Sequence, residues 1–258
     1  MGTALITGAS AGLGEEFAWQ LAAAGHHLVL VARRTDRLTA LAERIHNVSG
    51  VQVEVLPADL TLPDDVARVA ERLAADEPRP IGLLVNNAGL GLQHRFLNST
   101  LEEELTALDV MVRAVLVLSH AAGRAMVGRG HGAILNVSSM AQDTAMGTYA
   151  AHKAWVRAFT ESLATELAGT GVTATAVLPG LTHTEFHATA HMDESAWPRA
   201  AWLSAEQVVD AALAAVRRGD VLCVPSVKYK LASALLHAAP RRLVRAATGA
   251  RVHARSRK

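Results

Sequence analysis

A tyrosine and a lysine four residues apart are the side chains whose types and spacing point most directly to chemistry. Tyr149 and Lys153 lie in the segment Tyr-Ala-Ala-His-Lys, which opens a run with helical periodicity, so they share one helix face. A phenol with a pKa of about 10 is a poor acid or base at neutral pH, whereas a neighbouring ammonium stabilises the phenolate and lowers that pKa. The pair therefore predicts acid–base chemistry in which Tyr149 exchanges a proton with an oxygen of a substrate.

A glycine-rich segment near the start of the chain has the properties of a phosphate-binding turn. Thr7–Gly14 reads Thr-Gly-Ala-Ser-Ala-Gly-Leu-Gly and stands between a strand-like run and a helix-like run. Glycines let the backbone turn tightly and approach a pyrophosphate, while the free N–H groups at the helix start point toward it. The residues expected to contact a dinucleotide in this segment are Gly8, Ser10, Gly12, Leu13 and Gly14.

Two arginines at the end of the second strand-like run indicate which dinucleotide is bound. A carboxylate at this point would bind the adenine ribose and repel a 2′-phosphate, whereas arginine pairs with that phosphate. Arg33 and Arg34 stand here with no acidic residue at this point, which favours NADP(H) over NAD(H). The alternative is a solvated arginine pair at a strand end.

Two further strand ends carry candidate cofactor contacts. Asp59-Leu60 follows the third strand-like run, where the carboxylate could meet the adenine amino group. Asn87-Ala88-Gly89 closes the fourth, and its small residues would let the backbone pass close to a dinucleotide. In open α/β sheets ligands bind beyond the carboxyl ends of the strands, so these residues are expected on the same side as the glycine-rich turn.

The elements that must position these residues alternate between strand-like and helix-like segments. Short runs rich in Val, Ile and Leu predict parallel strands covered on both faces, at Thr3–Thr7, His27–Ala32, Val51–Leu56, Ile81–Asn86, Ala133–Val137, Thr173–Leu178 and Val221–Val224. Helical periodicity fills the segments Gly14–Gly25, Asp36–His46, Leu62–Ala75, Leu101–Val127, Thr148–Ala168 and Ala205–Arg217. The alternation predicts a Rossmann-type, doubly wound parallel sheet of about seven strands, with helices on both faces. Since no linker or repeat interrupts the sequence, we expect one dinucleotide-binding domain over residues 1–258.

Two more motifs complete an ordered set. Ser138-Ser139 precedes the tyrosine, and Pro179-Gly180 followed by Thr184 comes after the lysine. With these motifs in this order, the chain resembles the short-chain dehydrogenase/reductase family from the first strand to about Thr184. The resemblance implies transfer of the pro-S hydride of a nicotinamide, with Tyr149 donating the proton to a carbonyl oxygen.

The same resemblance implies roles for other residues. Lys153 would bind the ribose hydroxyls and lower the pKa of Tyr149, and Ser139 would hold the substrate oxygen. Pro179, Gly180, Thr182 and Thr184 would lie beside the nicotinamide. Much of the family forms homodimers or homotetramers, here through the helices Leu101–Val127 and Thr148–Ala168.

The chain departs from the family pattern at two places near the catalytic residues. The family usually has an asparagine on its long fourth helix, where it helps to hold a water that links the lysine to solvent, and the matching residue here is Met111. A thioether is a weak acceptor and cannot donate, so this proton relay is either rebuilt with water or impaired. An NADP(H)-binding sensor or partner subunit with little catalysis is therefore the alternative function. The loop from Ser139 to Tyr149 is also shorter than in typical members, which leaves Ser138 as the fallback for the serine role.

The segment 181–203 is expected to cover the substrate site. It contains Phe186, Met192, Trp197 and Trp202, an apolar lining that predicts a hydrophobic ketone or aldehyde and its alcohol as substrates. His183, His187 and His191 recur every four residues, but no carboxylate or cysteine completes a ligand set, so no metal is predicted.

Composition and charge limit the location and the partners. The single cysteine, Cys223, the absence of an apolar run of about eighteen residues and the absence of a recognisable signal peptide predict a cytoplasmic protein without a membrane span. The net charge of +1 hides a basic end, since the chain from Val221 onward has nine basic residues and no acidic residue. The extension 226–258 is predicted to form short amphipathic helices over the substrate site, with peripheral contact to an anionic membrane as the alternative. No nucleic acid partner is expected.

Overall fold

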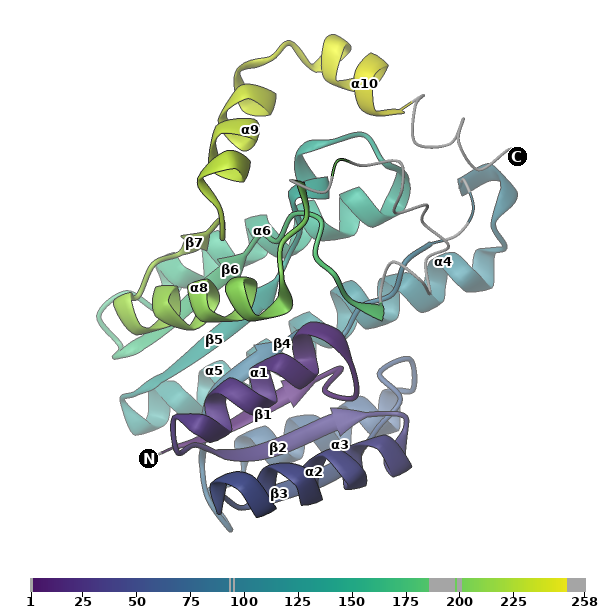
Figure 1. The fold of residues 1–258 in the computed structure, drawn as a ribbon. Helices are drawn as coiled ribbons and strands as arrows, with labels where there is room; N and C mark the ends of the chain where they lie inside the picture. Colours follow the sequence, from purple (N-terminus) through teal and green to yellow (C-terminus); the bar gives the residue numbers. More distant parts are fainter. Residues whose placement is uncertain (1, 93, 95, 186–197, 199–200, 250–258) are drawn as a thin grey trace.

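Seven parallel strands form one sheet in the computed structural model, which describes residues 2–92, 94, 96–185, 198 and 201–249. The strands are β1 (Thr3–Thr7), β2 (His27–Ala32), β3 (Val53–Pro57), β4 (Ile81–Asn86), β5 (Gly132–Val137), β6 (Val172–Val177) and β7 (Leu222–Cys223). They are hydrogen-bonded in the order β3-β2-β1-β4-β5-β6-β7, and every neighbouring pair is parallel. The arrangement confirms the predicted Rossmann-type sheet (Figure 1), in which the chain changes direction across the sheet between β1 and β4.

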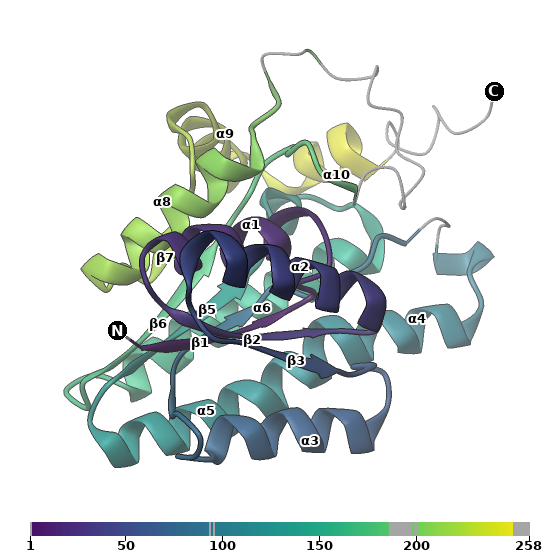
Figure 2. The same cartoon turned by 60° about the horizontal axis from the view of Figure 1, so that its bottom comes forward.

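Helices cover both faces of this sheet, as Figure 2 shows. One face packs against α1 (Gly12–Ala23), α2 (Thr35–Ser49) and α8 (Ala205–Arg218), and the other against α3 (Pro63–Ala74), α5 (Ala114–Arg129) and α6 (Gly147–Glu166). Along β1, Leu5 belongs to one apolar core and the next residue, Ile6, belongs to the other. Because successive side chains of a strand point to opposite faces, a strand between two cores must be apolar throughout.

The predicted helix Leu101–Val127 is a continuous helical run with an irregularity in the middle. α4 (Leu101–Leu108) leads into a π-helical turn at Asp109–Arg113, and α5 continues to Arg129. By length and composition the run could cross a membrane, but Leu118 and Ala122 are buried in the core against the sheet. Periodicity alone does not reveal a π-helical turn, because such a turn adds a single residue to the run.

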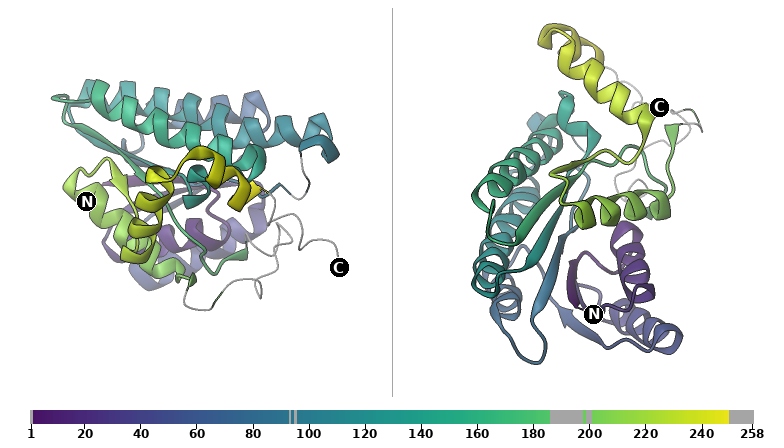
Figure 3. Two further views of the ribbon diagram at one scale, coloured as in Figure 1. Left: turned by 90° about the horizontal axis from the view of Figure 1, so that it is seen from above. Right: turned by 90° about the vertical axis from the view of Figure 1, so that its left-hand side faces the viewer.

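Two helices follow the last strand. α9 (Val227–Ala238) and α10 (Arg241–Gly249) are the short C-terminal helices that the sequence led us to expect. In Figures 1 and 3 they (yellow) lie over the end of the domain where α6 begins, while α2 and α3 lie at the far end of the molecule.

Candidate active site

The start of α6 and the turn after β5 bring the three predicted catalytic side chains together. Tyr149 lies in the first turn of α6 and Lys153 one turn later, with the lysine Nζ 5.8 Å from the centre of the tyrosine ring. The Ser139 hydroxyl is hydrogen-bonded to the Tyr149 phenol. The same hydroxyl accepts a backbone hydrogen bond of 3.1 Å that caps the 3-10 turn Met140–Asp143, so the turn fixes the serine in place.

Burial shifts the pKa of both ionisable groups. It raises the pKa of Tyr149 to about 12, opposite to the lowered pKa that the sequence led us to expect, although the hydrogen bond with Ser139 acts toward a lower pKa. Lys153 is 5% exposed, and its burial lowers the lysine pKa to about 8. The Lys153 Nζ donates a 2.8 Å hydrogen bond to the carbonyl oxygen of Val137. At neutral pH the site therefore holds a protonated phenol beside an ammonium, a state that can donate a proton to a carbonyl oxygen.

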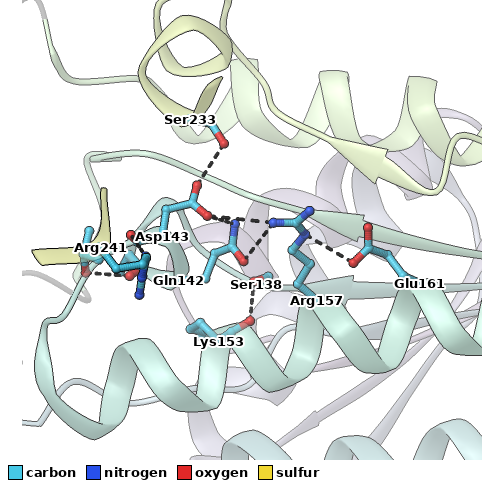
Figure 4. A network of polar contacts seen from close by, with 10 residues as sticks. Ser138, Gln142, Asp143, Lys153, Arg157, Glu161, Ser233 and Arg241 are labelled. Atoms are coloured by element: carbon cyan, nitrogen blue, oxygen red, sulfur yellow. Dashed lines mark hydrogen bonds and ion pairs between the residues drawn. The ribbon is translucent and has the colours of Figure 1, made fainter. Parts of the chain in front are cut away.

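The neighbouring Ser138 makes a different contact. Its buried hydroxyl donates a 2.7 Å hydrogen bond to the backbone carbonyl of Lys153, a link between β5 and α6 that Figure 4 shows. Ser139, and not Ser138, is thus the serine that touches the phenol.

Met111 lies close to the lysine, in the π-helical turn. Its side chain is 1% exposed. A Cβ atom on Gly89 would lie 3.6 Å from the Lys153 Nζ and 3.9 Å from the Met111 Cγ, so the three residues meet at one place. π-Helical turns occur frequently at functional sites, and this one brings the Met111 side chain to the same glycine as the buried ammonium.

The glycine-rich turn packs directly on the end of β4. Gly8 has a φ of +66°, a left-handed conformation that favours glycine, and a Cβ atom on Gly14 would lie 2.2 Å from the Gly8 carbonyl oxygen. The Thr7 hydroxyl accepts hydrogen bonds of 3.0 Å from the N–H groups of Asn87 and Ala88. Within the described residues no side chain caps the N-terminus of α1, so its first N–H groups suit an anionic group.

Arg33 and Arg34 lie in different surroundings. Arg33 is 3.8 Å from the carboxylate of Asp59, which also accepts hydrogen bonds of 3.0 and 2.8 Å from the backbone N–H and the hydroxyl of Thr61. Arg34 donates a 3.0 Å hydrogen bond to the Ser10 hydroxyl on the glycine-rich turn. The guanidinium of Arg34 and the hydroxyl of Ser10 together form a group of donors that suits a phosphate.

Two charged residues beside Arg34 were not predicted from the sequence. Arg37 donates hydrogen bonds of 3.3 and 3.1 Å to the two carboxylate oxygens of Glu185, and Arg34 lies 3.7 Å from the same carboxylate. A carboxylate therefore lies between two arginines near the Ser10 hydroxyl. No sequence pattern indicates this contact, because Arg37 and Glu185 are 148 residues apart.

The loop after β6 contacts both halves of the site. The Pro179 carbonyl accepts a 2.9 Å hydrogen bond from the N–H of Met140, next to the candidate serine. The Thr182 hydroxyl donates to the carbonyl two residues before it, at 3.0 Å. A Cβ atom on Gly12 would lie 3.2 Å from the Thr184 Cβ, so Thr184 lies against the glycine-rich turn.

Tyr229 of α9 holds this loop and was missed by the sequence analysis. Its ring lies so close to Gly180 that a Cβ atom there would be 2.0 Å from the ring. Its hydroxyl accepts a 3.0 Å hydrogen bond from the Leu181 N–H and donates a 2.8 Å hydrogen bond to the Ala201 carbonyl. α9 is thereby attached to the segment that the resemblance places beside the nicotinamide.

A second attachment joins the C-terminal helices to the turn that carries Ser139 (Figure 4). The buried Asp143 accepts hydrogen bonds of 2.8 Å from the Ser233 hydroxyl of α9 and 2.7 Å from the Gln142 amide, and it lies 3.8 Å from Arg157. Arg241 of α10 donates a 3.2 Å hydrogen bond to the Asp143 carbonyl. α9 is thus fixed both to the loop after β6 and to the turn that carries Ser139, and α10 is fixed to that turn.

Part of the segment expected to cover the substrate site lies outside the residues that the structure describes. Phe186, His187, His191, Met192 and Trp197 lie outside the described residues. Trp202 is described, and its ring stacks on His183 with the ring centres 4.5 Å apart. Across the described ranges, no group of three or more His, Cys, Asp or Glu side chains could hold a metal ion.

A family model described as short chain dehydrogenase matches residues 2–195 of the chain. Among curated proteins, sulfoacetaldehyde reductase 2 from Chromohalobacter salexigens is 37% identical over 187 residues, which cover 70% of this chain and 73% of that protein.

Solved structures show the same similarity over most of the chain. A short-chain dehydrogenase from Sphingobium yanoikuyae in complex with NADPH is 36% identical, with a TM-score of 0.83 over 93% of this chain and 97% of that one. The bulky-bulky ketone specific alcohol dehydrogenase from Comamonas testosteroni is 30% identical, with a TM-score of 0.79 over 93% of this chain and 96% of that one.

Proposed function

The chain belongs to the short-chain dehydrogenase/reductase family of oxidoreductases, and on that basis we propose that it uses NADP(H) to interconvert a hydrophobic ketone or aldehyde and its alcohol. The observation that carries the proposal is the group formed by Tyr149, Ser139 and Lys153, in which a phenol touches a serine hydroxyl and lies over a buried ammonium. The carboxyl ends of the strands bring this group to the same side of the sheet as the glycine-rich turn.

The residues at this side of the sheet fit a dinucleotide phosphate. A Cβ atom on Gly14 would strike the Gly8 carbonyl oxygen, so no side chain fits between these two glycines. The start of α1 can therefore offer its backbone N–H groups to a pyrophosphate. Arg34 and Ser10 offer donors to a 2′-phosphate, the feature that favours NADP(H). When bound, the dinucleotide supplies or accepts the hydride. The proposed contacts also include Gly12, Leu13, Arg33, Asp59, Leu60, Asn87, Ala88, Gly89, Pro179, Gly180, Thr182 and Thr184.

The chain's own residues move and stabilise the proton. In carbonyl reduction Tyr149 donates its phenolic proton to the substrate oxygen, since its high pKa keeps it protonated at neutral pH. The Ser139 hydroxyl donates to the same oxygen and orients it. The Lys153 ammonium stabilises the phenolate that remains and binds the ribose hydroxyls. In alcohol oxidation the same groups act in reverse.

Apolar side chains beside the catalytic turn support a hydrophobic substrate. Met140, directly after the candidate serine, packs with Leu178 and the Tyr229 ring. Of the two relatives, one is specific for bulky ketones and the other is a sulfoacetaldehyde reductase. The single, buried Cys223 fits our proposal that the enzyme works in the reducing cytoplasm.

We also propose a homodimer or homotetramer. Six large apolar side chains are exposed on the helical run from α4 to α5: Leu101, Leu105, Leu108, Leu116, Val117 and Val127. Contact between copies through this run and α6 would remove them from water.

The direct test measures NADPH and NADH consumption with a panel of apolar and charged ketones and aldehydes. We expect kcat/KM to be at least about tenfold higher with NADPH than with NADH, and apolar carbonyl compounds to be the better substrates. Preference for NADH would refute the cofactor assignment, and preference for small charged carbonyls would refute the substrate class.

Met111 favours one alternative, a sensor or partner subunit that binds NADP(H) with little catalysis. Its side chain meets Gly89 together with the lysine ammonium, at a place where a relay of hydrogen bonds would need a group that can donate. Comparing the wild-type protein with Met111→Asn separates the two functions. Turnover by the wild type supports the reductase, whereas turnover that appears only in Met111→Asn supports the alternative.

A further inference from the structure

The outer side of α9 carries a row of exposed apolar residues. Val227, Leu231 and Leu235 recur every four residues and are 71%, 68% and 76% exposed, and Leu243 of the adjacent α10 is 58% exposed. Residues at this spacing form a continuous row along a helix. Single exposed leucines are common on soluble proteins, but three large apolar side chains in a row along one helix form a patch of the kind that binds a partner or a membrane.

The inner side of α9 is fixed, so this row cannot turn into the domain. Tyr229 and Ser233 are one turn apart and bond to the loop after β6 and to Asp143 respectively. At about 100° per residue, the row of Val227, Leu231 and Leu235 lies on the opposite side of the helix from these two anchors. In Figures 1 and 3 the two helices stand at the outside of the domain.

Basic side chains flank the row. Lys228 and Lys230 lie about 100° and 60° from Val227 in opposite directions around α9, and both are exposed, although Lys228 also reaches the Trp202 carbonyl at 3.5 Å. On α10, Arg242 and Arg245 are exposed. The chain has no acidic residue from Val221 onward, so the surface presents one sign of charge around apolar side chains.

The apolar row and the basic side chains around it together indicate which kind of partner covers this face. A second copy that presents the same face would bring basic side chains against basic side chains, which is unfavourable. A neutral apolar partner would leave the flanking charges unused. The surface of a bilayer with anionic lipids matches both features, since leucines enter the acyl boundary and Lys or Arg side chains meet the headgroups.

We propose that the outer faces of α9 and α10 attach the protein peripherally to anionic membranes. The inference does not depend on the reaction proposed above. The attachment would hold the catalytic side of the domain next to the bilayer, where apolar carbonyl compounds concentrate.

The test is sedimentation of the full-length protein with vesicles of phosphatidylcholine alone or with about 30% phosphatidylglycerol. We expect binding to the anionic vesicles, weak binding to the neutral ones, and loss of binding when salt rises from about 0.15 to 0.5 M. The double variant Leu231→Gln/Leu235→Gln should lose at least tenfold in partition coefficient, and so should Lys230→Gln/Arg242→Gln/Arg245→Gln. Leu97→Gln is the matched control, because Leu97 is 89% exposed on a different part of the surface and should bind as the wild type does.

Two further measurements keep the result interpretable. NADPH binding should be unchanged in each variant, which shows that the domain is folded and keeps this test separate from the proposed reaction. Light scattering should give the same oligomeric state for the wild type and Leu231→Gln/Leu235→Gln. Vesicle binding that survives the leucine changes, or no binding at 0.15 M salt, overturns the inference. An oligomer that dissociates in the leucine variant also overturns it, because the face would then be covered by a second copy.

Discussion

Tyr149 and Lys153 have pKa values that move in opposite directions for the same reason. Burial penalises the charged form of each group, so it raises the pKa of the phenol to about 12 and lowers that of the ammonium to about 8. The two shifts leave the phenol protonated over the whole physiological range, while the ammonium is lost only in mildly alkaline solution. The state that serves carbonyl reduction is therefore present at neutral pH.

The pH dependence of kcat/KM should follow the protonation of Lys153. For carbonyl reduction we expect kcat/KM to be level up to about pH 8 and to fall about tenfold per unit above it, as Lys153 loses its proton and can no longer stabilise the phenolate. Alcohol oxidation should instead rise with pH, because it needs the phenolate. A reduction profile that stays level to pH 10 would contradict the assigned role of Lys153.

Glu185 should weaken the binding of a 2′-phosphate. Its carboxylate pairs with Arg37 and Arg34, the arginine that also holds Ser10, so a phosphate must displace it. Exposed ion pairs are worth up to about 1 kcal/mol each, so Glu185→Gln should bind 2′,5′-ADP about three- to tenfold more tightly and leave NAD⁺ binding unchanged. Isothermal titration calorimetry gives the affinities.

The matched control is Asp76→Asn, which removes an exposed carboxylate that pairs with Arg129. This variant should leave both affinities unchanged. Equal effects of Glu185→Gln on 2′,5′-ADP and on NAD⁺ would show that the carboxylate does not compete with the 2′-phosphate.

At the scale of elements, α9 joins two parts of the site that are far apart in sequence. Tyr229 holds the loop after β6, and Ser233 holds the Asp143 carboxylate on the turn that carries Ser139. Both anchors come from the extension rather than from the sheet, so this helix positions both the candidate nicotinamide loop and the candidate serine.

The two anchors should have separable effects. Tyr229→Phe removes the hydroxyl that fixes Leu181 and should raise the Kd for NADPH about three- to tenfold, while Ser233→Ala should raise the KM for the carbonyl substrate by a similar factor. Fluorescence titration and steady-state kinetics measure the two quantities. Identical changes in both variants would mean that α9 acts only on overall stability.

At the scale of the whole molecule, a buried polar network joins the sheet to the helices of one face. Asn86 and Asn136 are partners on β4 and β5, and the Asn86 side-chain amide donates to the Oδ1 of Asn136 at 2.9 Å and to the Ser119 hydroxyl of α5 at 3.0 Å. Asn136 in turn donates to the Thr160 hydroxyl of α6 at 2.9 Å. All four side chains are buried, so each needs the others as hydrogen-bond partners.

Breaking the network should be costly. Asn136→Ala leaves Asn86 with Ser119 as its one partner in the network and removes the donor to Thr160, so we expect the free energy of unfolding to fall by about 2–4 kcal/mol in urea titrations. The exposed Asn98→Ala should change it by less than about 0.5 kcal/mol. A loss below 1 kcal/mol in Asn136→Ala would show that the network adds little to stability.

Much of this architecture is predictable because its causes are local in sequence. Strands between two apolar cores must be continuous apolar runs, and Gly14 is required where a Cβ atom would strike the Gly8 carbonyl oxygen. The doubly wound parallel sheet, and the closeness of Tyr149, Lys153 and Ser139, follow from the position of each motif at a strand end. Helix and strand boundaries shifted by only a few residues.

The features that escaped prediction depend on contacts between distant segments. Tyr229 meets Leu181 across 48 residues, and Glu185 meets Arg37 across 148, so neither contact leaves a local pattern. The π-helical turn that contains Met111 also lies within an ordinary helical periodicity. Tertiary packing, rather than local propensity, determines these contacts.

The most direct test of the central claim is the rate of hydride transfer in a single turnover. NADPH-bound protein is mixed with the best apolar ketone in a stopped-flow instrument, and the loss of NADPH absorbance is followed. The rates of the wild type and of Tyr149→Phe are compared. Tyr229→Phe, measured at saturating NADPH, is the control for loss of a different tyrosine hydroxyl. We predict a rate about 10²–10⁴-fold lower in Tyr149→Phe, because the proton donor is lost, with the Kd for NADPH within about threefold of the wild type. A Tyr149→Phe rate within tenfold of the wild type would contradict the account, since the proton would then come from another group.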